Sequence, residues 1–234
     1  MNGVEHRAVN IRALFWCCDA VVFDLDGTLL QTLHGLQQAL NDVLGTHGFA
    51  AVSSELVRSS MHTGFAGSVQ AALQAVPNAT RHHAALLTAY RARYRETMVA
   101  QSAVYPGVHE VLQAQRARGC KLAVCTNRDE PVAMELLEGL GLDVYFNALI
   151  GLRDDDEPKP HPGLLLRSLK ALNIAPGQAL MVGDSAADAG CADAAGVPCL
   201  VFDGGYGADS LPPVARYARF ASYGELLQAR CLKV

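Results

Sequence analysis

Two aspartates separated by one residue, Asp24 and Asp26, carry the clearest chemical potential in the sequence. They end a short apolar run. Gly27 and Thr28 follow, a glycine that permits a sharp turn and a hydroxyl that can hydrogen-bond it. Two carboxylates at one strand end can share a single site when the backbone turns sharply after them. The alternative is a surface loop that merely ends a strand, but the apolar strand before the pair and the Thr-Leu after it argue against that interpretation.

Further polar residues follow other apolar runs. Thr126 and Asn127 end one run, and Asp184 and Ser185 end another. In an open parallel sheet the carboxyl ends of the strands meet at one edge, where ligands gather. We therefore expect these side chains to lie beside Asp24 in a single site.

The elements that must position these residues alternate along the chain. Short apolar runs end against polar or glycine residues, as strands buried on both faces do, and helical patterns lie between them. The predicted strands are residues 20–25, 121–126, 148–151, 179–183 and 198–202, and the predicted helices are residues 108–118, 131–140, 162–172, 186–195 and 223–231. This alternation predicts an α/β fold with a doubly wound, mostly parallel sheet and helices on both faces.

Residues 32–104 interrupt the alternation. They show several helical patterns and no convincing strand, and a Tyr-Pro-Gly turn at residues 105–107 returns the chain to the alternating pattern. We therefore predict a discontinuous catalytic core of residues 1–31 and 105–234, and an inserted α-helical cap domain of residues 32–104.

Composition argues against a disordered, a nucleic-acid-binding and a membrane protein. The 234 residues are 50% hydrophobic and 18% charged, which supports a substantial core and argues against disorder. A net charge of −4 gives no overall attraction to nucleic acid or to an anionic membrane. The apolar runs fall short of the ~18 residues that suggest a membrane span, and Asp19 interrupts the stretch that looks like a signal peptide. Seven cysteines without a CxxC spacing favour reduced thiols and a cytoplasmic location.

The candidate residues resemble, in order and spacing, four motifs of the haloacid dehalogenase superfamily of aspartate-dependent phosphohydrolases. The resemblance covers residues 18–230. The matching residues are Asp24 and Asp26 in the first motif, Thr126 and Asn127 in the second, Lys159 in the third, and Asp184 and Asp188 in the fourth. The insert resembles the helical cap of the branch that contains phosphoglycolate phosphatases and β-phosphoglucomutases. The resemblance thus implies a Rossmann-like core beneath a helical cap.

The resemblance implies a reaction through an aspartyl-phosphate. Asp24 is the expected nucleophile. Asp26 is the expected general acid and then base, which requires that Asp26 be protonated before turnover. Lys159 would offset the negative charge of Asp24 and of the phosphoryl group. The expected phosphate-binding residues are Thr126, Asn127, Asp24 and Lys159, although Asn127 could equally cap the turn.

The resemblance also implies Mg²⁺ as the cofactor, because this ion takes hard oxygen ligands and bridges carboxylate and phosphate. Its expected ligands are Asp24, Asp184 and the backbone carbonyl of Asp26. Asp188 lies one helical turn after Asp184 and is expected to support a metal-bound water or Lys159. The alternative for Asp188 is a charge that interacts favourably with the N-terminus of a helix.

Substrate specificity is expected to come from the cap. Residues 61–65 resemble the cap segment that faces the active site in these phosphatases. His62, Thr63 and Phe65 are therefore candidate substrate contacts. The alternative for the histidine is a structural or solvated side chain, which is common in helical inserts.

The leading prediction is a Mg²⁺-dependent phosphomonoester hydrolase that acts on a small phosphorylated metabolite, with phosphoglycolate as the first candidate. We expect a monomer or homodimer without nucleic-acid or membrane partners. The alternatives are a sugar phosphomutase of the β-phosphoglucomutase type and a non-catalytic binding or regulatory protein that kept the fold. A dehalogenase would lack the second aspartate, present here as Asp26. A phosphonate hydrolase would carry a cap lysine, and residues 32–104 contain none.

Overall fold

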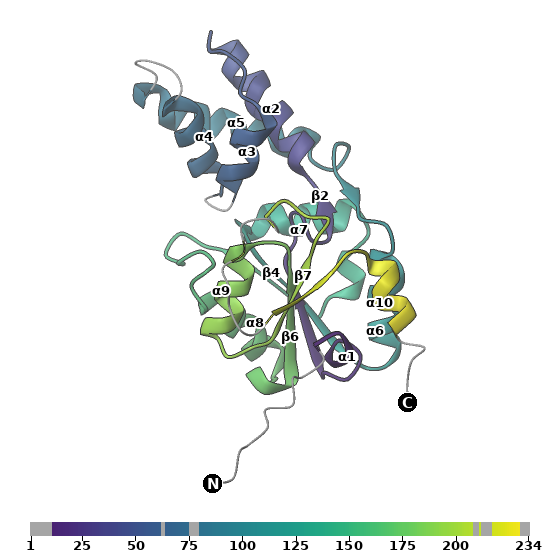
Figure 1. Cartoon of the computed structure of the whole chain (residues 1–234). Helices are drawn as coiled ribbons and strands as arrows, with labels where there is room; N and C mark the ends of the chain where they lie inside the picture. The colour runs from purple at the N-terminus through teal and green to yellow at the C-terminus, as the bar shows by residue number, and fades with distance from the viewer. Residues whose placement is uncertain (1–10, 62–63, 75–79, 208–210, 212–216, 230–234) are drawn as a thin grey trace.

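The computed structural model describes residues 11–61, 64–74, 80–207, 211 and 217–229. Its centre is a six-stranded sheet in which every pairing is parallel, with the strand order β5-β4-β1-β6-β7-β8 (Figure 1). These strands are β1 (Ala20–Phe23), β4 (Lys121–Asp129), β5 (Ala148–Leu152), β6 (Ala179–Gly183), β7 (Cys199–Phe202) and β8 (Tyr217–Phe220). The predicted α/β class, a doubly wound parallel sheet of Rossmann type, is confirmed.

Helices cover both faces of the sheet because its central strands are apolar on both sides. In β1, Val21 and Phe23 pack into one buried cluster, whereas Ala20 and Val22 pack into the other. Helices α8 (Gly163–Leu172) and α9 (Ala186–Ala194) lie against the second cluster, and α1 (Ile11–Leu14), α6 (Val108–Ala117), α7 (Glu130–Gly139) and α10 (Tyr223–Ala229) lie on the opposite face.

Among the described residues, four α-helices form most of the part of the chain between the first strand and the rest of the core. They are α2 (Leu33–Thr46), α3 (Ser54–Ser60), α4 (Gly64–Gln74) and α5 (His83–Thr97). They pack mainly on one another and stand at one end of the core (Figure 1). Two short strands, β2 (Leu30–Gln31) and β3 (Ala103–Val104), pair antiparallel where the chain enters and leaves these helices. The division into core and cap at these positions stays a prediction.

Several element boundaries differ from the sequence-based expectation. Strand β4 continues to Asp129 instead of ending at residue 126, and β8 was not predicted. The expectation of no strand within residues 32–104 was wrong for β3, because two residues are too few to show a period. No helix in the described part of the chain is long and apolar enough to span a membrane.

Candidate active site

The candidate residues meet at the carboxyl edge of the sheet. The strands β4, β1 and β6 are neighbours, and the chain reverses its direction of winding about β1, which is where ligands bind in open parallel sheets. Asp24 follows β1, Thr126 lies in β4, and Asp184 follows β6. With residues of α3, α4 and α5 they line a cavity of about 620 Å³ between the sheet and the inserted helices.

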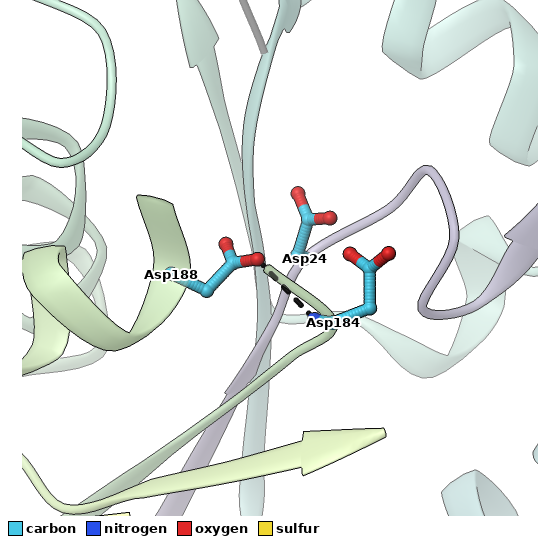
Figure 2. A group of neighbouring side chains, drawn as sticks. All are labelled: Asp24, Asp184 and Asp188. Carbon is cyan, nitrogen blue, oxygen red and sulfur yellow. Dashed lines mark hydrogen bonds between the residues drawn. The ribbon is translucent and has the colours of Figure 1, made fainter. Parts of the chain in front are cut away.

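Three buried carboxylates form the floor of the site. Oxygen atoms of Asp24, Asp184 and Asp188 lie within 4.8 Å of one another. Figure 2 shows their side chains converging from the end of β1, the loop after β6 and the first turn of α9. The Thr28 hydroxyl lies between two of them, 3.4 Å from Asp24 Oδ2 and 3.4 Å from Asp184 Oδ1.

Lys159 is the cation of this floor. Its Nζ donates to Asp24 Oδ1 at 2.6 Å, to Asp188 Oδ1 at 2.6 Å and to the Cys125 carbonyl at 2.9 Å. The three donors of the ammonium are thus all used, and the residue is only 4% exposed. The structure therefore places Lys159 beside Asp24, as the resemblance implied.

Asp188 supports its neighbours with both oxygens. Oδ1 accepts from Lys159, and Oδ2 accepts from the Ser185 hydroxyl at 2.6 Å. Oδ2 also accepts from the Asp184 backbone N–H at 3.2 Å, the dashed line in Figure 2. Gly183 makes room for this side chain, since a Cβ there would lie 2.4 Å from the Asp188 carboxyl carbon. This arrangement suits a residue that orients Lys159 and the Asp184 loop. It also places Asp188 at the N-terminus of α9.

The three carboxylates of the floor are only partly neutralised by the Lys159 ammonium. Burial raises the pKa of the Asp24 carboxyl well above its usual range, Asp188 and Asp184 add to this effect, and Lys159 opposes it. Burial, followed by the charge of Asp188, raises the pKa of Asp184 to about 7. Burial by itself would lower the pKa of Lys159, but Asp188 and Asp24 hold it well above its usual value. One ammonium faces three carboxylates, so this set of hard oxygen donors fits a divalent cation such as Mg²⁺.

Backbone encloses the Asp184 carboxylate on two sides. A Cβ at Gly27, where φ is +81°, would lie 2.3 Å from Asp184 Oδ2, and a Cβ at Gly205 would lie 2.4 Å from the same oxygen. The Tyr206 backbone N–H donates to this oxygen at 2.5 Å. One oxygen of Asp184 is therefore fixed by backbone, and the other lies near Thr28.

The Asp26 carboxylate is held apart from these three. Oδ2 accepts from Arg128 Nε at 3.0 Å, and Oδ1 accepts from Arg128 Nη2 and from the Thr32 hydroxyl. Paired hydrogen bonds from one guanidinium fix the orientation of a carboxylate. The role of Asp26 as general acid and then base, protonated before turnover, stays a prediction. Sequence reasoning missed Arg128, although a cation two residues after Thr126, at a strand end, was a usable signal.

Asn127 and Thr126 mainly organise the loops around the cavity. The Asn127 amide donates to the Lys159 carbonyl at 3.1 Å, and its oxygen accepts from the Lys159 N–H at 2.7 Å. This pair ties the Lys159 loop to β4. Thr126 Oγ1 accepts from the Arg128 backbone N–H at 3.2 Å, and both Thr126 and Asn127 line the cavity.

The inserted helices form the opposite wall. Phe65 lines the cavity, is 8% exposed and packs edge-on against Tyr90 and Tyr94. The other two candidate cap contacts, His62 and Thr63, lie outside the described residues. The remaining cap residues on the wall, which the sequence did not single out, include Glu55, Arg58, Ser59 and Ser68.

Tyr206 is a second residue that sequence reasoning missed. Its hydroxyl accepts from the backbone N–H groups of Thr32 at 2.7 Å and Leu33 at 3.1 Å, at the start of α2. Its own N–H donates to Asp184. Tyr206 therefore connects the carboxylate floor with the point where the chain enters the inserted helices.

Comparison with known proteins gives a consistent result. The family model of haloacid dehalogenase-like hydrolases matches residues 21–202. A phosphoglycolate phosphatase of Rhodospirillum rubrum is 39% identical over 217 residues, 89% of this chain and 90% of that protein. Another, of Chromobacterium violaceum, is 36% identical over 191 residues, 80% of this chain and 85% of that protein. A solved structure from Haemophilus somnus, described as a predicted phosphoglycolate phosphatase, has a TM-score of 0.80 and 26% identity, covering 91% of this chain and 98% of that one.

Proposed function

Because the chain belongs to the haloacid dehalogenase-like hydrolase family and is a phosphatase, we propose that it hydrolyses phosphomonoesters of small metabolites through an aspartyl-phosphate, with Mg²⁺ as its cofactor. One observation carries this proposal: Asp24 lies at a cavity floor, bonded to Lys159 and flanked by Asp184 and Asp188. A carboxylate in such a place can approach a phosphoryl group once its charge is offset.

The reaction would proceed in two halves. An oxygen of Asp24 bonds to phosphorus while the bond between phosphorus and the ester oxygen breaks, and Asp26 gives that oxygen a proton. Water then bonds to phosphorus, the bond to Asp24 breaks, and Asp26 takes the proton of the water. Lys159 and Thr126 are the residues that we assign to the phosphoryl oxygens, with Asn127 beside them.

Asp24 and Asp184 are the side chains that would hold Mg²⁺, together with the backbone carbonyl of Asp26. When bound, the ion supplies the positive charge that lets the substrate phosphate approach these carboxylates. Asp188 would support the site through its bonds to Lys159, to Ser185 and to the Asp184 backbone.

Phosphoglycolate is the substrate that we propose first. The relatives from Rhodospirillum rubrum and Chromobacterium violaceum carry that activity in their names. On the cap wall, Arg58 is a cation suited to a substrate carboxylate, and Phe65 lines the same cavity. His62 and Thr63, which lie outside the described residues, stay candidate substrate contacts from the sequence. A cytoplasmic location is proposed because the described cysteines are free thiols, which persist in reducing compartments.

A panel of phosphomonoesters tests the proposal. It should contain 2-phosphoglycolate, several sugar phosphates and p-nitrophenyl phosphate, each assayed with Mg²⁺ and after removal of metal by EDTA. Asp24→Asn should lower turnover about 10⁴-fold or more, because the nucleophile is lost. Asp193→Asn, on an exposed position of α9, is the matched control.

Each outcome of the panel has a distinct meaning. Release of inorganic phosphate supports a phosphatase, whereas an isomerised sugar phosphate would favour the phosphomutase. Activity that survives Asp24→Asn would remove Asp24 from its role as nucleophile. Full activity in EDTA would refute the requirement for Mg²⁺.

A further inference from the structure

Arg128 is a buried cation beside the proposed acid and base. It lies near the carboxyl end of β4, and its side chain is 4% exposed. Nε donates to Asp26 Oδ2 at 3.0 Å, and Nη2 donates to Asp26 Oδ1. Two parallel hydrogen bonds fix a carboxylate in orientation as well as in place. Arg128 therefore sets where the two oxygens of Asp26 point.

Further partners of this guanidinium belong to the inserted helices. Its central carbon lies 4.9 Å from the ring centre of Tyr94 in α5 and 5.8 Å from that of Phe65 in α4. Tyr94 is fully buried and Phe65 nearly so. A cation over aromatic rings is held more strongly when water is excluded. The guanidinium thus joins the sheet to the helices above it.

We propose that Arg128 is a positioning residue: with the cap seated, it holds the Asp26 carboxylate where it takes the proton of the water that cleaves the aspartyl-phosphate. In that step the water oxygen bonds to phosphorus, the bond to Asp24 breaks, and the proton passes to Asp26. The step needs an oriented carboxylate, which the paired hydrogen bonds provide. Because the cap rings hold the guanidinium, cap seating and the placement of Asp26 are coupled. This inference rests on the phosphatase function proposed above.

Hydrolysis of p-nitrophenyl phosphate isolates this step, because p-nitrophenolate leaves without a proton donor. For Arg128→Met we expect kcat to fall about 100-fold, in the range that a positioned base contributes. We expect kcat/KM, which reports phosphoryl transfer to Asp24, to change less than about 3-fold, so KM falls with kcat. Phosphorylated enzyme should then accumulate, which intact-protein mass spectrometry after acid quenching would measure.

Two further variants separate positioning from packing. Arg128→Lys keeps the charge and should recover part of kcat. Adding Arg128→Met to Asp26→Asn should lower kcat less than about 2-fold further, because both changes remove the same function.

The matched control is Arg95→Met, which breaks a half-exposed ion pair with Glu135 between α5 and α7 and leaves Asp26 untouched. Its kcat should stay within about 2-fold of wild type, since exposed pairs contribute little.

The coupling to the cap is tested at Tyr94. Tyr94→Leu removes one aromatic ring from its contact with the guanidinium. We expect kcat to fall about 5-fold while kcat/KM hardly changes. Tyr94→Phe keeps the ring and should recover most of that loss. Equal losses of kcat and kcat/KM in Tyr94→Leu would refute the coupling.

A parallel fall of kcat and kcat/KM in Arg128→Met, without phosphorylated enzyme, would overturn the role of Arg128. Additive losses in the Asp26→Asn background would do the same. Thermal unfolding by circular dichroism identifies variants that simply fail to fold, and for these Arg128→Lys gives the decisive comparison. If the wild-type protein hydrolyses no phosphomonoester, the proposed function fails. If the wild-type protein hydrolyses phosphomonoesters and Arg128→Met has the same kcat, only the inference about Arg128 fails.

Discussion

At the scale of single residues, charge balance governs the site. The Lys159 ammonium contacts two buried carboxylates, those of Asp24 and Asp188, and is itself almost inaccessible to water. Taking charged groups out of water is costly unless each finds a partner. Lys159 therefore matters for stability as well as for chemistry, and the two roles can be measured separately.

Replacing Lys159 by Met should destabilise the fold in a pH-dependent way. Near pH 8 without metal we expect a loss of about 3 kcal/mol in the free energy of unfolding, because Asp24 and Asp188 lose their shared partner. Near pH 5 the loss should be smaller, since burial raises the pKa of Asp24 and protonation removes its charge. Urea denaturation at both pH values checks this, with exposed Lys170→Met as the control. Equal losses at the two pH values would contradict it.

A single methyl group at Gly205 should weaken the proposed metal site. A Cβ there would lie 2.2 Å from the Asp184 Cβ and 2.6 Å from the Gly27 carbonyl oxygen, so one of them must move. We expect Gly205→Ala to weaken Mg²⁺ binding about 10- to 100-fold, as changes beside metal ligands do. Titration calorimetry measures this, and Gly45→Ala, in open space on α2, is the control. Unchanged affinity in Gly205→Ala would show that the loop yields without disturbing Asp184.

At the scale of elements, the entry into α2 is tied to the carboxylate floor. The Tyr206 hydroxyl accepts from two N–H groups at the start of α2, groups that a helix cannot satisfy by itself. The same residue fixes Asp184 through its backbone. The loop after β7 therefore supports both the proposed metal site and the junction with the cap.

Tyr206→Phe should loosen this junction while leaving the sheet intact. The ring remains, but Thr32 and Leu33 lose their acceptor, which we expect to cost about 1 kcal/mol. Hydrogen exchange of these two amides should accelerate, while amides of β1 and β6 keep their rates. Tyr145→Phe, which removes an exposed contact with His109, is the control. Unaltered exchange at Thr32 and Leu33 would mean that water replaces the hydroxyl at no cost.

The sequence predicted most elements of the core because each local pattern agrees with the fold. The strand over residues 179–183 matches β6, since both faces are buried and the run is continuously apolar. Strand β8 escaped prediction because this edge strand contains the exposed Arg219 and is only partly buried. Asp24, Thr126 and Asp184 could be placed together from the carboxyl ends of parallel strands, and Lys159 could be added from the family resemblance. The contact of Arg128 with Tyr94 could not, because it depends on where the cap sits, which no local pattern contains.

At the scale of the whole molecule, the cap is joined to the core by contacts of unequal strength. The ion pairs Arg91–Asp129 and Arg95–Glu135 are half-exposed, and such pairs contribute little to stability. The stack of Arg128 against Tyr94 is buried. A movement of the inserted helices away from the sheet would break this buried contact, and it would separate Arg128, the partner of Asp26, from Tyr94 at the same time.

Protons and the proposed Mg²⁺ should compete for the Asp184 carboxylate, and each should stabilise the folded protein when it binds. The pKa of Asp184 is raised to about 7 in the folded protein from an ordinary value of 3.8, so the folded state binds this proton more tightly than the unfolded state does. Its contribution to stability is therefore present at low pH and is lost as pH rises through about 7. In the proposed site Mg²⁺ would bind the ionised carboxylates of the folded protein, so millimolar Mg²⁺ should raise Tm more near pH 8 than near pH 5.

Differential scanning fluorimetry of wild type and Asp184→Asn, with and without Mg²⁺, checks this competition. The asparagine cannot titrate and binds the ion poorly, so the variant should lose the share of the pH-dependent fall of Tm that comes from Asp184, and it should lose the response to Mg²⁺. Taking the difference between the two proteins cancels the titration of exposed acidic groups that both share. A response to Mg²⁺ that is equal at the two pH values, or that persists in Asp184→Asn, would place the ion elsewhere than on the buried carboxylates.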